Sequence, residues 1–358
     1  MKKLRIGFLS TAGIGRRNWK AVFHSGNAVV SAVASRDLQK SRRFINECQR
    51  DFAFPDPPVA FGSYEEMLAS PLIDAVYIPI PTALRQPFVI EAAREGKHVL
   101  CEKPCAANSS IVAEMIAACE ASRVQFMDGV MFMHSPRLPK VRSVLDDGQS
   151  IGALRRISSA FTFSAAQSFF RENIRANGAL EPAGCLGDLG WYSIRFALWV
   201  MKWQLPHTVT ARILSASESF PEHPSAPVDF SAEMCFEGGV SCAFYCSFIT
   251  GGQQWTHVSG QKGWLLLPDF VHPHNSFEPS FEVNRTIIQV EGAQKCPAGV
   301  DPAIQGHAAA QDAIMWRNFA TQVLSGKLNP DWPMWALKTQ KVLDACHEAA
   351  REGRPMKL

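Results

Sequence analysis

The sequence has little of what a membrane-spanning, secreted or nucleic-acid-binding protein needs. The chain has 358 residues, and none of its apolar stretches approaches the length of roughly 18 uninterrupted residues that a membrane helix needs. The short apolar run after Lys2 and Lys3 is broken by Gly7 and leads into Ser10 and Thr11, so it predicts a first β-strand rather than a signal peptide. A formal net charge of +3, with scattered arginines, is too small to indicate nucleic acid as a main partner. We therefore expect a cytoplasmic chain that binds neither membrane nor nucleic acid.

A metal or disulfide pattern is also lacking, although the chain has 10 cysteines. No CxxC pair occurs, and without a secretion signal the thiols are interpreted as reduced and mostly buried. His272-Pro-His274 is a lone HxH without further ligands, and such a pair is more often part of a loop. No metal site is therefore expected.

Residues 1–127 alternate short apolar runs with helical patterns. The expected strands are 4–9, 28–34, 73–79, 98–102 and 124–127. The expected helices are 17–24, 38–49, 86–95 and 109–121, with one more beginning at a capping box formed by Ser63 and Glu66. This alternation predicts βαβ units, and hence an α/β Rossmann domain with a parallel sheet and helices on both faces.

The pattern changes in residues 128–358. The expected strands here are 154–164, 230–236, 240–248, 255–258, 264–267 and 287–290, and the expected helices are 186–201, 311–324 and 335–352. Polar and apolar residues alternate in the two strands that flank Glu237-Gly238-Gly239, which predicts a hairpin. Such alternation indicates an antiparallel sheet with one covered and one more open face. This region is predicted to be an α+β domain for substrate binding and oligomerisation.

The turn after the first expected strand is built from small residues. It consists of Ser10, Thr11, Ala12, Gly13, Ile14 and Gly15. The first, third and sixth of these stand where the dinucleotide fingerprint GxGxxG has glycines. Small residues let the backbone approach a pyrophosphate, and the following helix N-terminus supplies free N–H groups. Taken alone, the turn is equally consistent with a tight βα connection that binds no ligand.

The second expected strand ends in Ser35 and Arg36, at about the distance from the turn where the ribose-binding residue of a Rossmann domain stands. An acidic residue there would bind the ribose hydroxyls of NAD, whereas an arginine pairs with the 2′-phosphate of NADP. Arg36 therefore favours NADP, with NAD still possible. The other interpretation is a surface arginine followed by Asp37 as a helix cap.

Two further strand ends are suited to the same site, because ligands of an open parallel sheet lie beyond the carboxyl ends of its strands. One end carries Pro79, Pro81 and Thr82, and the next carries Glu102, Lys103 and Pro104. A residue before proline is held extended. The amine of Lys103 can donate to a substrate oxygen, or take part in proton transfer if burial lowers its pKa.

A third segment, residues 187–192, lies on an expected helix and includes Asp188 and Tyr192. These two residues are four apart and so share one helix face. A free tyrosine has a pKa of about 10, which a neighbouring lysine ammonium lowers by stabilising the phenolate. Tyr192 is thus a candidate for the proton transfer that accompanies hydride transfer. Two points stay open: whether Lys103 or Tyr192 moves the proton, and whether Tyr192 and Asp188 form only a buried hydrogen bond.

Taken together, these residues resemble the Gfo/Idh/MocA oxidoreductase family over nearly the whole chain. The resemblance is carried by the glycine turn, Ser35-Arg36, the segment 96–104, Met127-Asp-Gly129, the segment 184–192 and Lys338-Thr-Gln-Lys-Val-Leu-Asp344. Tyrosine at position 192, where other members have histidine, is similar to the subgroup of trans-1,2-dihydrobenzene-1,2-diol dehydrogenase and glucose–fructose oxidoreductase.

The resemblance implies that Lys103 and Tyr192 line the nicotinamide site with support from Asp188, and that the Lys103–Pro104 bond can be cis. It implies reversible oxidation of a secondary alcohol in a sugar, polyol or cyclic diol, and dimers or tetramers that associate through the open sheet. Relatives often carry histidine after the segment 81–84. Arg85 in its place would favour an acidic substrate or point outward.

Four residues are candidate substrate contacts: His134, Gln167, Arg175 and Trp191. An indole can stack on a sugar ring, although helix packing is its more common role. Two other functions stay open, a glycosidase that uses transient oxidation by tightly held NAD(P), and a non-catalytic NAD(P)-sensing regulator on the same fold. Retention of both Lys103 and Tyr192 argues against the regulator.

Overall fold

The computed structural model describes residues 2–217, 224–273, 280–284, 294–297 and 310–358, and the chain divides into two compact units. The first unit is Met1–His134 with Gly306–Leu337, and the second is Ser135–Gln305 with Lys338–Leu358. The first unit thus includes a segment from near the C-terminus. A division of the domains at residue 127 stays a prediction. His274 and the expected strand 287–290 lie outside the described residues.

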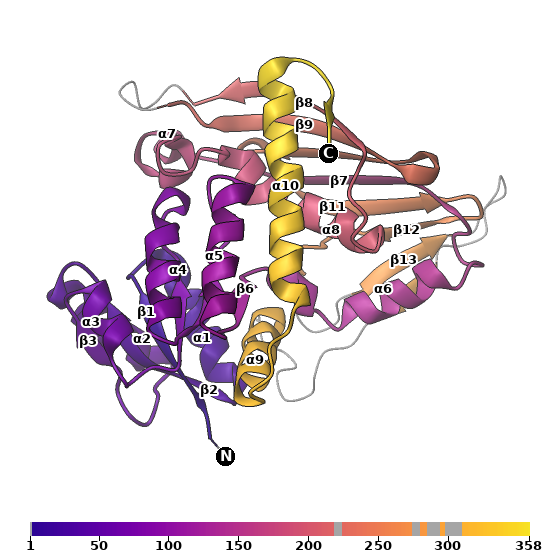
Figure 1. Cartoon of the computed structure of the whole chain (residues 1–358). Coiled ribbons are helices and arrows are strands. Elements are labelled where there is room, and N and C mark those ends of the chain that lie inside the picture. The colour runs from indigo at the N-terminus through magenta and orange to yellow at the C-terminus, as the bar shows by residue number, and fades with distance from the viewer. Residues whose placement is uncertain (1, 218–223, 274–279, 285–293, 298–309) are drawn as a thin grey trace. The chain divides into compact units, whose positions relative to one another are not determined.

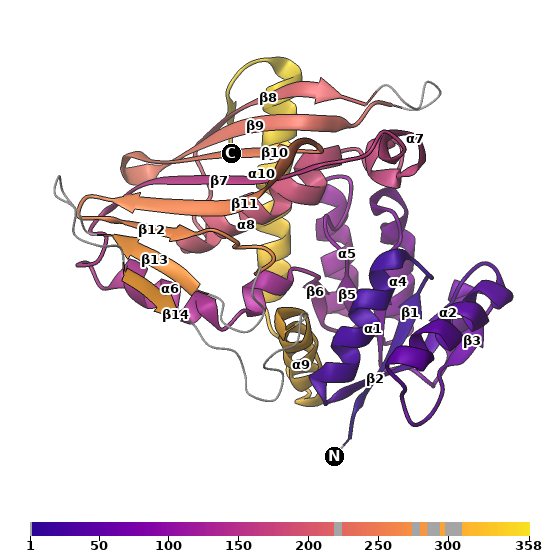
Figure 2. The same cartoon turned by 180° about the vertical axis from the view of Figure 1, so that it is seen from behind.

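The first unit contains a parallel sheet of six strands in the order β3-β2-β1-β4-β5-β6. These are β1 (Leu4–Leu9), β2 (Ala28–Ala34), β3 (Val59–Phe61), β4 (Ala75–Ile78), β5 (His98–Cys101) and β6 (Phe126–Asp128). The helices are α1 (Gly13–Ser25), α2 (Leu38–Asp51), α3 (Tyr64–Ala69), α4 (Arg85–Arg94), α5 (Ser109–Ala121) and α9 (Ala310–Leu324). Helices α4 and α5 cover one face of the sheet, and α1 and α2 cover the other (Figures 1 and 2). The predicted Rossmann architecture is confirmed.

Local capping explains where the helices of this unit begin. Asp37 caps α2 and accepts a hydrogen bond from the backbone N–H of Gln39 at 2.8 Å. Ser63 caps α3, because its hydroxyl accepts a hydrogen bond from the backbone N–H of Glu66 at 3.2 Å. This is the serine contact of the expected capping box. Helix α1 begins at Gly13, four residues before the expected start, so Gly13, Ile14 and Gly15 of the expected turn already belong to the helix.

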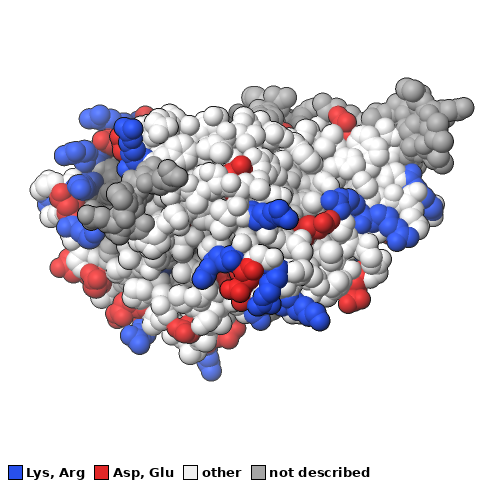
Figure 3. All heavy atoms as spheres, turned by 90° about the horizontal axis from the view of Figure 1, so that it is seen from above, with Lys and Arg blue, Asp and Glu red and all other residues white. Residues whose placement is uncertain are grey.

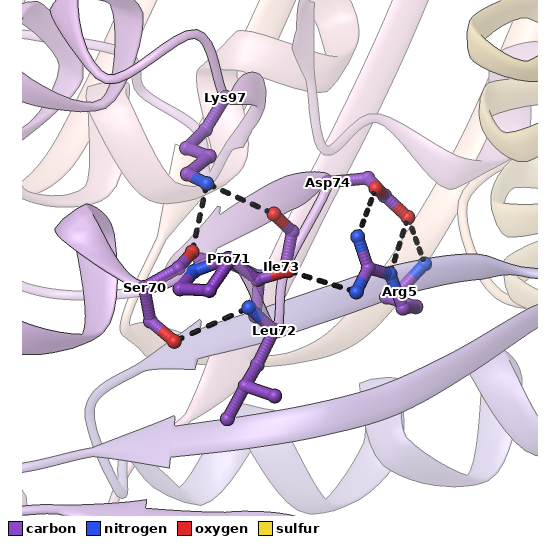
Figure 4. Close-up of polar contacts among 7 residues, drawn as sticks. All are labelled: Arg5, Ser70, Pro71, Leu72, Ile73, Asp74 and Lys97. Atoms are coloured by element: carbon purple, nitrogen blue, oxygen red, sulfur yellow. Dashed lines mark hydrogen bonds and ion pairs between the residues drawn. The ribbon is translucent and has the colours of Figure 1, made fainter.

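An ion pair fastens the amino ends of the central strands (Figure 4). The carboxylate of Asp74 accepts from the backbone N–H of Arg5 at 3.0 Å and from its Nη2 at 2.7 Å. Beside it, Lys97 Nζ donates to the carbonyl oxygens of Ser70 at 2.8 Å and Ile73 at 3.0 Å. Because the strands are parallel, these contacts lie at the edge opposite the carboxyl ends, and they hold the chain that leads into β4.

The second unit contains a nine-stranded sheet in the order β14-β13-β12-β11-β7-β10-β9-β8-β15. Its strands are β7 (Leu154–Ser164), β8 (Thr208–Ala216), β9 (Pro227–Phe236), β10 (Val240–Ser247), β11 (Ile249–Gly260), β12 (Trp264–Leu267), β13 (Ser280–Asn284), β14 (Gln294–Pro297) and β15 (Met356–Lys357). The predicted hairpin joins β9 to β10, and the pairs are antiparallel except for β7 with β10. The predicted α+β domain with a large, mostly antiparallel sheet is confirmed.

Helices lie on one face of this sheet (Figures 1 and 2). They are α6 (Arg137–Asp146), α8 (Trp191–Val200) and the second-unit part of α10 (Asp331–Glu352). Strands β9 and β10 alternate buried and half-buried residues, as expected when only one face is covered. On the face drawn in Figure 3, acidic and basic side chains lie side by side between uncharged areas. Among the described helices, none has the length and apolarity to cross a bilayer.

Candidate active site

The turn between β1 and α1 leaves the helix N-terminus open. No side chain of the described residues caps α1, and a Cβ built on Gly13 would meet no described heavy atom within 4 Å. Gly15 has a different surrounding, since its Cβ would lie 3.1 Å from the ring of Phe44. The third glycine position therefore serves helix packing, while the exposed N–H groups around Gly13 suit the phosphates of a dinucleotide.

Ser10 stands at the first glycine position of the fingerprint and adopts a backbone conformation that favours glycine. Its φ is 133°, in the region that favours glycine, and its hydroxyl accepts from the backbone N–H of Ala12 at 3.2 Å. The turn thus keeps the backbone path of the glycine fingerprint although two of its three glycines are replaced.

Arg36 is exposed at the end of β2, next to the buried Ser35. Burial raises the pKa of Tyr64, and the hydrogen bond and positive charge of Arg36 offset part of that rise. The ring of Tyr64 packs edge-on against Phe88 with centroids 5.2 Å apart. The sequence did not indicate Tyr64, which comes near Arg36 because β3 pairs with β2 and leads into α3.

The ends of β4 and β5 carry the segment around Lys103. The Lys103–Pro104 bond is cis, as the family resemblance implied. The Glu102 carboxylate accepts from Tyr77 Oη at 2.5 Å and from the backbone N–H of Lys103 at 3.3 Å. Gly129 packs against the same carboxylate, since a Cβ there would lie 3.4 Å from it. Glu102 is therefore fixed on two sides directly beside Lys103.

A buried chain of hydrogen bonds leads from α9 to Glu102. Trp316 Nε1 donates to the Asn18 side-chain oxygen at 2.8 Å, and Asn18 Nδ2 donates to Tyr77 Oη at 2.7 Å. Burial and the Glu102 charge raise the pKa of Tyr77 well above its usual range, so its hydroxyl stays a donor. Sequence reasoning missed this chain, because its members are up to 298 positions apart.

Arg85 is buried and does not point outward. It is only 4% exposed, and its guanidinium donates to the carbonyl oxygens of Ile80, Glu102 and Pro104. The expectation that Arg85 points outward is therefore wrong, whereas a preference for an acidic substrate stays a prediction. Its donors are used to connect the segment after β4 with the segment after β5.

In the second unit, Asp188 lies in a π-turn (Leu186–Gly190) that leads directly into α8. Its carboxylate forms an ion pair with Arg175, with 2.9 Å between Nε and Oδ2. The charge of Asp188 is the main reason that the pKa of Arg175 is raised, and Glu181 and Tyr192 add to it. Tyr192 packs edge-on against Phe161 at 5.5 Å. The structure thus brings Tyr192, Asp188 and Arg175 together within this unit.

The other expected substrate contacts have different surroundings. Trp191 is completely buried, and its indole Nε1 has no hydrogen-bond partner among the described residues. Gln167 is exposed just before α7 (Phe169–Glu172). His134 belongs to the first unit, where its Nδ1 lies 3.1 Å from the Asn318 amide. Of the four, Arg175 forms an ion pair with Asp188.

The comparisons with known proteins find matches for both parts of the chain. Residues 4–130 match the oxidoreductase family with an NAD-binding Rossmann fold, and residues 139–266 match the GFO/IDH/MocA C-terminal domain. The chain is 31% identical over 270 residues to trans-1,2-dihydrobenzene-1,2-diol dehydrogenase of Mus musculus, a match that covers 74% of both chains.

Two solved structures share the fold at 24% identity. Aldose–aldose oxidoreductase from Caulobacter crescentus, crystallised with glycerol, has a TM-score of 0.82 and is covered over 100% of both chains. A 3-ketoreductase from Actinomadura kijaniata, crystallised with NADP and TDP-benzene, has a TM-score of 0.81, covering 97% of this chain and 98% of that one. From the two family matches, the chain belongs to the GFO/IDH/MocA family and is an oxidoreductase with an NAD(P)-binding Rossmann domain.

Proposed function

We propose that the protein is an NADP-dependent dehydrogenase that interconverts a secondary alcohol and its ketone in a sugar, polyol or cyclic diol. The observation that carries the proposal is the retention of two proton-handling groups in ordered surroundings. Lys103 follows the anchored carboxylate of Glu102, and Tyr192 lies near the ion pair of Arg175 and Asp188. The mouse relative is named for a cyclic diol, which supports this substrate class.

The proposed chemistry divides between cofactor and chain. A bound nicotinamide supplies the hydride acceptor for oxidation, or the hydride donor for reduction. In the oxidation, the substrate hydroxyl loses its proton to the phenolate oxygen of Tyr192 or to the neutral amine of Lys103. Arg175 holds the Asp188 carboxylate in place, so that the charges around Tyr192 are arranged before the substrate binds.

Arg36 supports NADP over NAD as the preferred cofactor. It is exposed at the end of β2, where the ribose of a dinucleotide lies in a Rossmann domain, and Tyr64 steadies its guanidinium. We expect Arg36→Ala to weaken NADP binding about 10- to 100-fold, which is the loss of one charge-assisted contact. Its NAD affinity should stay unchanged. Fluorescence titration measures both, and equal losses for the two cofactors would contradict the assignment.

A screen of sugars, polyols and diols for NADP reduction tests whether the protein is a dehydrogenase. Lys103→Ala and Tyr192→Phe should each lower kcat about a hundred-fold or more, as expected for removal of a general acid–base group. Lys327→Ala, which removes an exposed lysine that belongs to none of the expected site residues, is the matched control. If both site variants keep the biological activity of the wild type, the protein is a regulator rather than an enzyme.

A glycosidase with transient oxidation remains the alternative. It would release product with no net NADPH, and the cofactor would co-purify with the protein. Net NADPH formed in proportion to the oxidised alcohol distinguishes the dehydrogenase from this alternative.

We also propose that the chain forms a dimer or tetramer through the open face of the nine-stranded sheet. This face carries half-exposed Tyr245, Trp255 and Trp264, and no described helix covers it (Figure 2). Aromatic residues on an unpaired sheet face are typical of an interface. Light scattering should give a multiple of the chain mass for the wild type and a monomer for Trp255→Glu. A wild-type monomer at high concentration would disprove this.

A further inference from the structure

Arg85 stands where its charge alone would not be favoured. It is the first residue of α4, and a helix dipole disfavours a cation at its N-terminus. Only 4% of the residue is exposed. Within the described residues its hydrogen bonds end on backbone carbonyl oxygens rather than on a carboxylate. Burial of a guanidinium costs free energy unless its donors are hydrogen-bonded. The contacts of Arg85 must therefore offset this cost, because its position at the start of α4 does not.

The three acceptors of Arg85 come from two different loops. Nε donates to the Ile80 carbonyl oxygen at 2.7 Å, just after β4. Nη1 donates to the Glu102 carbonyl oxygen at 2.6 Å, and also to that of Pro104. Glu102 and Pro104 are the two neighbours of Lys103 in the chain. Thr82 adds a weaker contact to the same Pro104 oxygen at 3.4 Å.

We propose that Arg85 is a positioning residue for Lys103. Its guanidinium holds the peptide carbonyls on both sides of Lys103 and fastens them to the end of β4. The lysine side chain therefore extends from a backbone that is fixed at both neighbours, and its amine keeps one location at the site. A guanidinium suits this task because its donors form a rigid planar fork, whereas an ammonium is a single point on a flexible stem. The inference rests on the proposed role of Lys103.

The first experiment separates positioning from binding. Arg85→Ala should lower kcat about 10- to 100-fold, because a small misplacement of a catalytic group has effects of this size. The KM for the alcohol and the Kd for NADPH should stay within about threefold, since Arg85 contacts neither ligand in this assignment. Arg94→Ala, at the exposed end of the same helix, should behave as wild type. If Arg85→Ala does not fold, Arg85→Lys, which keeps the charge, should show the same pattern.

Chemical rescue tests directly whether the guanidinium group of Arg85 holds the carbonyl oxygens beside Lys103, a contact that we call the clamp. The space left in Arg85→Ala should admit free guanidinium ion at concentrations well below those that denature the protein. Guanidinium should restore kcat at least about tenfold, while urea, which has similar shape and no charge, should restore little. Equal responses to both additives, or no response to either, would overturn the rigid charged clamp.

The last readout does not depend on activity. Pyridoxal 5′-phosphate followed by borohydride labels lysines, and mass spectrometry of peptides gives the rate at each one. In Arg85→Ala the rate at Lys103 should rise several-fold, while the rate at Lys97, held by two carbonyls elsewhere, should not change. A folded variant with unchanged Lys103 labelling overturns the proposal. If the wild type oxidises no alcohol, the proposed function fails, and this labelling still decides on the clamp.

Discussion

Arg175 and Asp188 are joined by an ion pair of 2.9 Å, formed between a short loop helix and the π-turn that precedes Tyr192. The Asp188 side chain is 15% exposed and that of Arg175 is 42% exposed, so solvent screens the pair only in part. The pair thus ties the loop of Arg175 to Asp188, four residues before Tyr192. Arg175 is therefore not simply a solvent-facing loop arginine.

The pair should matter more for turnover than for stability. We expect Arg175→Gln to lower kcat about tenfold, because Asp188 and its π-turn lose their fixed position beside Tyr192. The free energy of unfolding should change by about 1 kcal/mol or less, since the guanidinium is substantially exposed. Steady-state kinetics and urea unfolding measure the two effects. Arg171→Gln, an exposed arginine of the preceding helix, is the control, and equal losses in both variants would contradict a specific role.

The two glycines of the cofactor turn should respond in opposite ways to the same substitution. Gly13→Ala should leave the melting temperature nearly unchanged, because its Cβ meets nothing within 4 Å, and should weaken NADP binding by crowding the phosphates. Gly15→Ala should destabilise the first unit by about 1 kcal/mol or more, because its Cβ would crowd the Phe44 ring at 3.1 Å. Calorimetry and cofactor titration test both, and a binding defect in Gly15→Ala alone would refute the assignment.

Tyr77→Phe should destabilise the protein by about 1–3 kcal/mol, because the buried Asn18 amide and the Glu102 carboxylate each lose a partner. The substitution removes a single oxygen and keeps the ring that packs against Phe8 and Trp316. Tyr245→Phe is the matched control, since that hydroxyl bonds Thr250 on the open sheet face. Similar unfolding free energies for the two variants would show that the buried chain contributes nothing.

The ion pair of Arg5 and Asp74 predicts a pH dependence of stability. Burial acts to raise the pKa of Asp74, but the hydrogen bonds and charge of Arg5 outweigh it, so the pKa is lowered overall. A carboxyl with a lowered pKa stabilises the fold above its ordinary value near about 4, and this contribution is lost as the pH falls through the lowered pKa. Asp74→Asn should therefore cost about 1 kcal/mol at pH 7.

The comparison is made by urea unfolding of wild type and Asp74→Asn at neutral and acidic pH. The difference between the two proteins should shrink as the pH falls from about 4 through the lowered pKa of the folded state, where the wild-type carboxyl becomes protonated. A difference that stays constant with pH would mean that Asp74 acts through neutral hydrogen bonds alone.

Much of the fold was predictable because local patterns carried it. Strands β1, β2 and β7 have the bounds expected from their apolar runs, and Asp37 caps α2 as its position suggested. Strand β8 (Thr208–Ala216) was missed, because it lies next to the sheet edge and its residues alternate with little apolar character. The helix expected from residue 186 begins instead with a π-turn, a distinction that periodicity alone does not make.

The sequence by itself determined the Rossmann alternation, and it indicated the small-residue turn, Arg36, Lys103 and Tyr192 as the candidate cofactor-binding and catalytic residues. These follow from residue type and local spacing. Only the tertiary structure decided what surrounds them. Tyr64 comes beside Arg36 through strand pairing, and Arg85 turns inward because three carbonyl oxygens from separate loops meet there. Such contacts depend on distances between residues far apart in the chain, and no local pattern records those distances.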